Sequence, residues 1–224
     1  MSTISMPEAD RATIQRRLSQ GMVDEVTMLI IADEGSAIAK EIADIANTMA
    51  GLSPKIKVEV QNADGGRNQR MRELHIERWP VLVLTKGDFS RIRYYGIPAG
   101  YELPAMVDAI VELSAMRTPL SPKARAALST VRRRANIKVF VLTTCPFCPT
   151  VARHAFRGAI ESPRVTAEVI DSSLFPDLAA RHSVMGVPKI VLNDNLDITG
   201  AITDVEFFEK LRDSDHALVD SMYG

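Results

Sequence analysis

The same order of secondary-structure elements can be read twice along this chain, and this repeat limits its fold more than any other feature. In the first half, apolar residues at helical spacing predict helices, and short β-rich runs predict strands. The predicted helices cover 8–20, 36–50, 68–75 and 103–116, and the predicted strands cover 23–32, 55–60, 81–84 and 91–95. A segment with two prolines, 117–122, follows as a connector.

The second half repeats this order of elements. Its predicted helices cover 124–134, 150–160, 176–182 and 205–212, and its predicted strands cover 138–142, 165–170, 189–192 and 196–199. Internal repeats decide architecture before detail does. The sequence therefore predicts an α/β protein of two similar domains in tandem, 1–118 and 119–224, each a mixed β-sheet flanked by helices. Each domain would have about 110 residues, enough to bury a core.

The two cysteines of the chain lie in one Cys-Pro-Phe-Cys-Pro run between a predicted strand and a predicted helix. This spacing puts the thiols of Cys145 and Cys148 one helical turn apart, which is typical of a redox-cycling dithiol. At a helix start, unpaired N–H groups and the helix dipole favour the thiolate, which is the nucleophilic form. We therefore predict that Cys145 attacks the substrate disulfide. Cys148, which is more shielded inside the helix, is predicted to resolve the resulting mixed disulfide.

Neighbouring residues complete the predicted site. Pro146 is expected at the first helical position, where its missing N–H costs nothing, and Phe147 is expected to present an apolar face beside the sulfurs. Pro188 precedes a strand of the second half, as Pro80 does in the first. A proline here ends part of the hydrogen-bond ladder of the sheet. The backbone beside it, at Val187, is then free to pair with an extended substrate. Pro146, Phe147, Val187 and Pro188 are thus the predicted substrate-binding residues.

Three other interpretations of the cysteine pair stand beside the redox one. A structural disulfide would close almost no loop and stabilise little. A zinc site needs about four ligands, and the four histidines show no partner spacing: His75, His154, His182 and His216. The third interpretation is a pair of buried thiols that do not react. We expect a redox-active pair, with no metal and no cofactor other than a Cys145–Cys148 disulfide.

The first half has no dithiol. Aligning the two repeats places 34–37, with the sequence Glu-Gly-Ser-Ala, opposite the cysteine motif. No side chain there exchanges disulfides, and Ser36 could cap the following helix instead. The first domain is therefore predicted to be redox-inert.

Composition and charge exclude several classes of partner. The formal net charge is −1, which gives no sign of a nucleic-acid or membrane partner. No apolar run reaches the roughly 20 residues that span a bilayer, and the first ten residues do not read as a secretory signal. The expected compartment is the cytoplasm, where a cysteine pair of this kind is transient and catalytic.

With these features the chain resembles the glutaredoxin-like protein disulfide oxidoreductases of the tandem type, known from archaea and some bacteria. It is also similar to the N-terminal domain of the flavoprotein subunit of alkyl hydroperoxide reductase. The resemblance rests on 145–149, 186–188 and 93–102, and it covers essentially the whole chain. It implies two thioredoxin-like domains, with Pro188 and Pro80 in cis and Pro188 opposite the dithiol. Many tandem oxidoreductases carry a dithiol in both halves, whereas this chain, like the hydroperoxide reductase module, has a silent first half.

The resemblance and the dithiol together predict a thiol-disulfide oxidoreductase that acts on protein disulfides, with a thioredoxin-reductase-like flavoprotein as electron donor. One alternative is a dedicated relay that passes electrons from a flavoprotein to a peroxiredoxin. Another, of a different class, is a binding or scaffold module whose dithiol senses redox state.

Other polar residues near the motif are given lesser roles. Arg153 and His154 are expected to be solvated residues of the helix. Asp171 is expected at the surface or in a capping role. No clear counterpart is found for the buried carboxylate that helps to deprotonate the resolving thiol of a thioredoxin.

Overall fold

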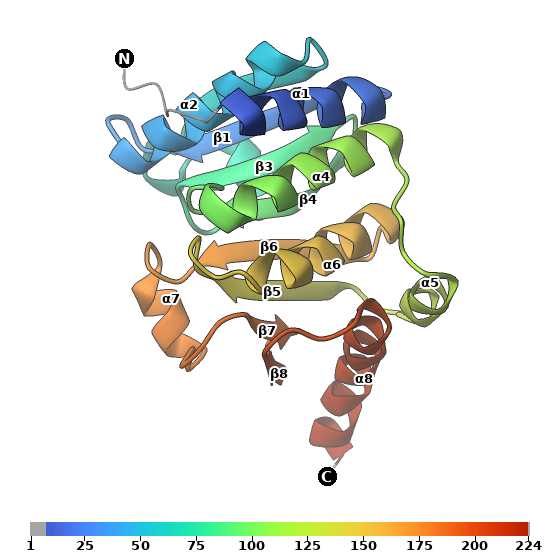
Figure 1. Ribbon diagram of the computed structural model, residues 1–224. Coiled ribbons are helices and arrows are strands. Elements are labelled where there is room, and N and C mark those ends of the chain that lie inside the picture. The colour runs from blue at the N-terminus through green and yellow to red at the C-terminus, as the bar shows by residue number, and fades with distance from the viewer. Residues whose placement is uncertain (1–7, 224) are drawn as a thin grey trace.

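One eight-stranded sheet forms the centre of the molecule (Figure 1). The computed structural model describes residues 8–223, except for the side chains of Ala9 and residues 215–223. The strands lie in the order β2-β1-β3-β4-β6-β5-β7-β8. Their bounds are β1 Val26–Ala32, β2 Ile56–Asn62, β3 Val81–Lys86, β4 Phe89–Tyr95, β5 Ala135–Val141, β6 Val165–Asp171, β7 Lys189–Leu192 and β8 Leu196–Thr199.

The helices follow the predicted order. Their bounds are α1 Glu8–Gly21, α2 Ala37–Leu52, α3 Gln69–Glu73, α4 Leu103–Ala115, α5 Pro122–Ser129, α6 Cys148–Glu161, α7 Pro176–Arg181 and α8 Asp204–Tyr223, with short 3₁₀ turns η1 Asp64–Gly66 and η2 Gly100–Glu102. Two helices differ clearly in extent from the prediction. Helix α5 ends at Ser129 because the chain then turns to start β5 at Ala135, which pairs with Val165. Helix α8 begins one residue earlier than predicted and continues to Tyr223.

The two halves of the sheet have the same topology. In the first half β1 pairs with β2 in parallel and with β3 antiparallel, and β3 pairs antiparallel with β4. In the second half β5 pairs with β6 in parallel and with β7 antiparallel, and β7 pairs antiparallel with β8. The predicted repeat of two α/β domains is therefore present in the structure, whereas the division at 118/119 stays a prediction.

The two half-sheets join along β4 and β6, which the sequence did not indicate. These strands pair in parallel from Ile92 with Ala167 to Tyr95 with Ile170. An unpaired strand leaves a row of open N–H and C=O groups, and each half-sheet covers one such edge of the other. The domains thus share one sheet rather than carrying one each.

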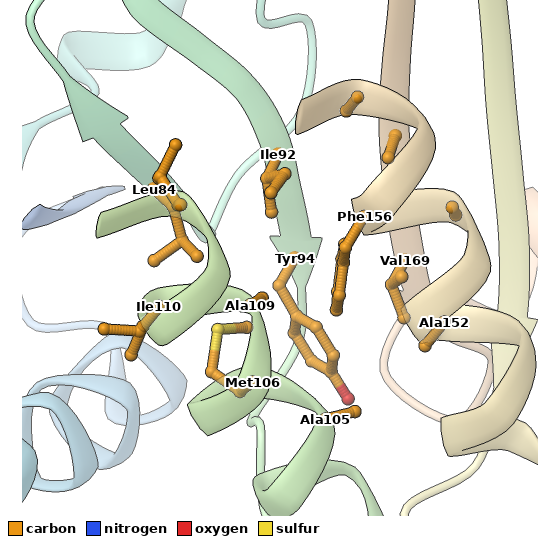
Figure 2. Packing of buried hydrophobic residues seen from close by; sticks show 14 of the residues in the cluster. Leu84, Ile92, Tyr94, Ala105, Met106, Ala109, Ile110, Ala152, Phe156 and Val169 are labelled. Carbon is orange, nitrogen blue, oxygen red and sulfur yellow. The ribbon is translucent and has the colours of Figure 1, made fainter. Parts of the chain in front are cut away.

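On one face of this sheet, helices α4 and α6 lie side by side across the join (Figure 1). One apolar cluster runs through both halves on this face. Figure 2 shows Tyr94 of β4 and Phe156 of α6 side by side between the two helices, and both side chains are about 1% exposed. Aromatic side chains bury large apolar areas, so separating the halves would expose part of a common core.

Polar contacts also join α4 to α6. Arg153 bonds Asp108 at 2.7 Å, and Arg157 bonds Glu112 through both carboxylate oxygens. Glu112 is 5% exposed, and a buried carboxylate needs a partner of this kind. The orientation of the two halves is therefore fixed by charge pairing as well as by apolar packing.

No helix in the described part of the chain is both long enough and apolar enough to cross a membrane.

Candidate active site

The two cysteines lie where β5 ends and α6 begins, and both are free thiols. The backbone N–H of Cys148 donates to the Sγ of Cys145 at 3.2 Å. The sulfur thus accepts a hydrogen bond from one of the free N–H groups of the helix start, as an N-cap side chain does. The sulfur thus lies at the positive end of the α6 dipole.

The start of α6 differs from the prediction. The helix begins at Cys148, and Phe147 is its N-cap, so Pro146 precedes the helix instead of opening it. The sulfur of Cys145 caps the N–H of Cys148 from outside the helix. Pro149 falls in the first helical turn, where proline is tolerated.

The loop before β7 faces the cysteine motif. The Val187-Pro188 and Trp79-Pro80 peptide bonds are both cis, which confirms the implied geometry of both prolines. The Sγ of Cys145 lies 3.9 Å from the carbonyl oxygen of Val187. The structure therefore brings Val187 and Pro188, which lie far along the chain from the motif, next to the first cysteine.

Two exposed apolar side chains lie in the loops around the sulfurs. Phe147, between the cysteines, is 64% exposed, and Met185, three residues before Pro188, is 96% exposed. Cys145 itself is only 9% exposed. These two side chains, which we call the apolar rim, lie in the two loops beside a sulfur that is itself nearly buried.

Cys148 lies behind Cys145 with no exposed surface. Burial raises the pKa of the Cys148 thiol, and the hydrogen bond with Cys145 and the charge of Glu102 act in the same direction. Because only a thiolate is nucleophilic, Cys148 needs a group that removes its proton before it can react.

The first domain forms one wall of this site. The backbone N–H of Tyr101, in η2, donates to the carbonyl of Thr143 at 3.0 Å. Gly100 has φ +57°, and a Cβ on it would lie 2.5 Å from the same carbonyl oxygen. Glycine is therefore required there, because the two backbones approach too closely for a side chain.

Directly after this contact, Glu102 brings a buried carboxyl from the first domain to the dithiol of the second. Its side chain has no exposed surface, and neither carboxyl oxygen has a hydrogen-bond partner among the described residues. Burial raises the pKa of the Glu102 carboxyl to about 7, while Arg153 lowers it and Asp171 raises it. The negative charge of the Glu102 carboxylate in turn raises the pKa of the Cys148 thiol.

Sequence reasoning missed Glu102. An acidic residue at the start of a helix is ordinarily a solvated group that complements the dipole, and nothing in the local pattern distinguishes this one. The available signal was its place at the end of the run 93–102, which carries the resemblance to tandem oxidoreductases.

The lesser expectations have mixed outcomes. The prediction that Arg153 and His154 are solvated is wrong: Arg153 pairs with Asp108, and His154 is 8% exposed and lies beside Phe207. Arg153 faces α4 and His154 faces α8, because both of these helices pack against α6. Asp171 is buried, so a surface position is wrong. Its Oδ1 accepts from the N–H and the hydroxyl of Ser173 in the turn after β6, and it does not cap α7, whose N-cap is Phe175.

No group of three or more histidine, cysteine or acidic side chains that could hold a metal ion occurs among the described residues. The side chain of His216 lies outside them.

The equivalent place in the first domain is capped by a hydroxyl. Ser36 is the N-cap of α2 and accepts from the N–H of Ala39, as predicted. Across from it, the indole N–H of Trp79 donates to Asp33 at 2.6 Å. The first domain thus keeps the cis-proline geometry of the second without its thiols.

Comparisons with known proteins agree with this geometry. Residues 135–213 match the thioredoxin domain family. The structure is similar to that of the alkylhydroperoxide reductase AhpF of Enterococcus faecalis, with a TM-score of 0.85, 29% identity and coverage of 92% of this chain and 99% of that one. It is also similar to a protein disulfide oxidoreductase of Aeropyrum pernix, with a TM-score of 0.81, 25% identity and coverage of 92% and 91%.

A curated relative gives the same indication. The corresponding alkyl hydroperoxide reductase protein, AhpF, of Xanthomonas campestris pv. phaseoli is 25% identical over 179 residues, which are 80% of this chain and 32% of the relative. The chain thus spans about a third of that protein's length. The expected resemblance is confirmed: the chain consists of two thioredoxin-like domains in tandem and is similar, over most of its length, to proteins named alkyl hydroperoxide reductase AhpF and protein disulfide oxidoreductase.

Proposed function

We propose that this protein is a thiol-disulfide oxidoreductase that reduces protein disulfides through Cys145 and Cys148. The observation that carries the proposal is the position of the Cys145 sulfur. It accepts the N–H of Cys148 at 3.2 Å and lies 3.9 Å from the carbonyl of Val187, next to a cis-proline.

The first step is attack by the Cys145 thiolate on one sulfur of a substrate disulfide. The substrate S–S bond breaks, one substrate sulfur leaves as a thiolate that takes up a proton, and the other forms a mixed disulfide with Cys145.

In the second step, Cys148 resolves the mixed disulfide. Its thiolate attacks the Cys145 sulfur, the mixed disulfide breaks and the second substrate sulfur leaves. Two electrons have then passed to the substrate, and Cys145 and Cys148 are joined by a disulfide. We assign Glu102 as the acceptor of the Cys148 proton, because it is a buried carboxyl near that thiol with a pKa of about 7 and no hydrogen-bond partner among the described residues. A base with a pKa near the working pH is the most effective one.

The apolar rim is the proposed binding surface for the substrate. Phe147 and Met185 offer exposed apolar contacts, and the backbone at Val187 would pair with an extended substrate segment, with Pro188 fixing that loop. Pro146, which is exposed, lies between the rim and Cys145 in the chain. A protein substrate with an accessible disulfide fits such a surface.

The oxidised dithiol needs a two-electron donor to return to its reduced form. We propose a thioredoxin-reductase-like flavoprotein in the cytoplasm for this role. The similarity to proteins named alkyl hydroperoxide reductase AhpF favours a second candidate function, in which the dithiol passes electrons from a flavoprotein to a peroxiredoxin.

The test is an insulin-reduction assay with dithiothreitol as reductant, run on the wild type, Cys145→Ser and Ser36→Ala. We expect wild-type activity, none for Cys145→Ser, and wild-type activity for Ser36→Ala, which changes the equivalent place in the silent domain. Full activity of Cys145→Ser would refute the proposal. A wild type that is inactive on insulin but reduces a purified peroxiredoxin would establish the relay.

A further inference from the structure

The face of the sheet opposite α4 and α6 is only partly covered by helices. The short helices α3 and α7 pack over an apolar cluster that includes Tyr95, Phe140 and Ile170, near the ends of β4, β5 and β6. Nearer the starts of these strands the same face becomes polar. Arg93 lies beside Glu168, and Glu168 lies beside Lys138, in one row across three strands.

Two cavities lie along this polar half of the sheet. One has a volume of about 570 Å³ and lies over the row of Arg93, Glu168 and Lys138. The other, of about 500 Å³, lies at the starts of the strands. They share Asn136, Thr166 and Asp194, so they form one continuous groove. Each volume is in the range of small-molecule sites.

Three arginines line the second cavity, which we name the arginine pocket: Arg91 from β4, Arg134 just before β5 and Arg164 just before β6. The pocket therefore exists only because the two domains share a sheet. Its single acidic residue, Asp194, is already paired with the ammonium of Lys138 at 2.5 Å.

The positive charge of the pocket is not neutralised by the protein. Among the described residues, Arg134 and Arg164 form no ion pair and are exposed. Arg91 donates from Nε and Nη2 to the carbonyl of Ala159 and lies 4.4 Å from the centre of the Phe89 ring. That arrangement holds the Nε–Nη2 edge of Arg91 against a carbonyl in the last turn of α6. The guanidinium groups open to a ligand are therefore those of Arg134 and Arg164. The chain as a whole has a net charge of −1, so this concentration of cations is local.

The polar groups of the wall suit an oxyanion. Thr166 and Asn136 lie opposite each other on β6 and β5. They bring a hydroxyl and a side-chain amide to the pocket beside the guanidinium groups. Guanidinium groups bind phosphate oxygens with two parallel hydrogen bonds, which a carboxylate-lined or apolar pocket cannot offer.

We propose that the arginine pocket binds a ligand with a chain of phosphates, with further phosphates or an attached group extending into the groove toward Lys138. The site is separate from the redox chemistry. Arg134 precedes β5 and Cys145 follows it, and the seven residues of β5 span about 20 Å. Free oligophosphate and a nucleoside triphosphate share the chemistry that the pocket recognises.

The experiment is isothermal titration of the reduced full chain with tripolyphosphate and, separately, with ATP. The pocket variant is Arg134→Gln with Arg164→Gln. The matched control is Arg132→Gln with Arg133→Gln, which removes the same charge from exposed residues of the same segment that do not line the pocket. We expect the pocket variant to weaken binding by at least about tenfold and the control by less than about twofold. Insulin reduction should stay unchanged in both.

Equal affinities for the two probes would identify the phosphate chain as the whole ligand, whereas tighter binding of ATP would place its nucleoside in the groove. The proposal is overturned if neither probe binds at about millimolar concentration. It is also overturned if both double variants lose affinity equally, since a diffuse cationic surface would do that, or if a glutamate-rich peptide or a single-stranded oligonucleotide binds more tightly than either probe.

Discussion

The backbone N–H of Tyr101, in the half of the chain that has no cysteine, donates a hydrogen bond of 3.0 Å to the carbonyl of Thr143, two residues before Cys145 in the other half. The loop that carries Cys145 is therefore shaped by a domain that has no thiol of its own. Glu102 follows directly and brings a buried carboxyl close enough to affect the pKa of the Cys148 thiol. The silent domain thus contributes to the chemistry by position, and its contribution can be tested at single residues.

Gly100 is the first of these residues. A Cβ there would lie 2.5 Å from the carbonyl oxygen of Thr143, so Gly100→Ala should destabilise the protein and slow insulin reduction by displacing the dithiol loop. The matched control is Gly87→Ala, which has nearly the same φ, +54° against +57°, but nothing within 4 Å of the added carbon. Left-handed backbone costs both variants about 1–2 kcal/mol, and crowding should add about 1–3 kcal/mol to Gly100→Ala alone. Equal urea midpoints and equal rates would contradict this.

The order of attack can be read from trapped intermediates. Cys148→Ser should accumulate a mixed disulfide between Cys145 and a substrate cysteine, because the second step is removed while the first remains. Cys145→Ser should accumulate none. Mass spectrometry under non-reducing conditions, after mixing with a disulfide-bonded peptide, distinguishes the two. Trapping by Cys145→Ser instead would reverse the assigned roles.

A rate that depends on Glu102 should change with pH around its pKa of about 7. Below this pH the carboxyl is protonated and cannot accept the proton of Cys148, so resolution of the mixed disulfide should accelerate as pH rises through about 7. Glu102→Gln cannot accept a proton at any pH, and at a pH of about 8 it should resolve about 100-fold more slowly than the wild type. At a pH of about 5 the two should be similar. Stopped-flow release of substrate thiol measures both, and a Gln variant that keeps the wild-type profile would exclude Glu102 as the acceptor.

The same carboxyl should make the fold less stable at neutral pH than at acid pH. Its pKa is raised from 4.5 to about 7 by folding, so the native state holds a proton that the unfolded state has released. The free energy of unfolding therefore loses up to about 3 kcal/mol from this group as pH rises between about 4.5 and about 7. Urea titrations at pH values of about 5 and about 8 should show this loss in the wild type and a smaller pH difference in Glu102→Gln. If the difference is the same in both proteins, the carboxyl has an ordinary pKa.

The ion pair between Arg157 and Glu112 is a second determinant of stability. Glu112 and Arg157 have side chains that are 6% and 17% exposed, and Glu112→Gln would leave the guanidinium without its counter-charge between the domains. We expect the free energy of unfolding to fall by about 3 kcal/mol. Glu73→Gln removes a carboxylate from the exposed pair with Arg70, whose side chains are 47% and 40% exposed, and should change it by less than about 1 kcal/mol. Equal losses of unfolding free energy in the two variants would show that the inter-domain ion pair contributes no more to stability than the exposed one.

The topology could be predicted from the sequence because the spacing of apolar residues marks the helices and strands of each half. These helices and strands also recur in the same order in the two halves. The dithiol could be predicted because Cys145 and Cys148 are the only thiols in the chain and follow a strand. The place of Pro188 was predictable from its position in the repeat. These features are local, or are repeated along the chain.

Features that depend on how the halves meet could not be predicted. The pairing of β4 with β6 leaves no mark in either strand, because the alternation of side chains along a strand is the same whether its edge is free or paired. The burial of Glu102 follows from that pairing, since η2 packs against α6 only in the assembled fold. His154 is buried within its own half, where α8 packs against α6 and Phe207 lies beside the imidazole. Polar residues on this helix therefore read as solvated in sequence and are buried in the structure.

The pairing of β4 with β6 also determines how the protein can meet its substrates. Because the two domains share a sheet and a core, they cannot close around a client as two lobes joined by a hinge do. Cys145 is only 9% exposed, and no closure of the two domains brings further groups around it. A client must therefore present a disulfide that already protrudes from its own surface, or unfold locally to do so, and the choice among clients rests with their flexibility.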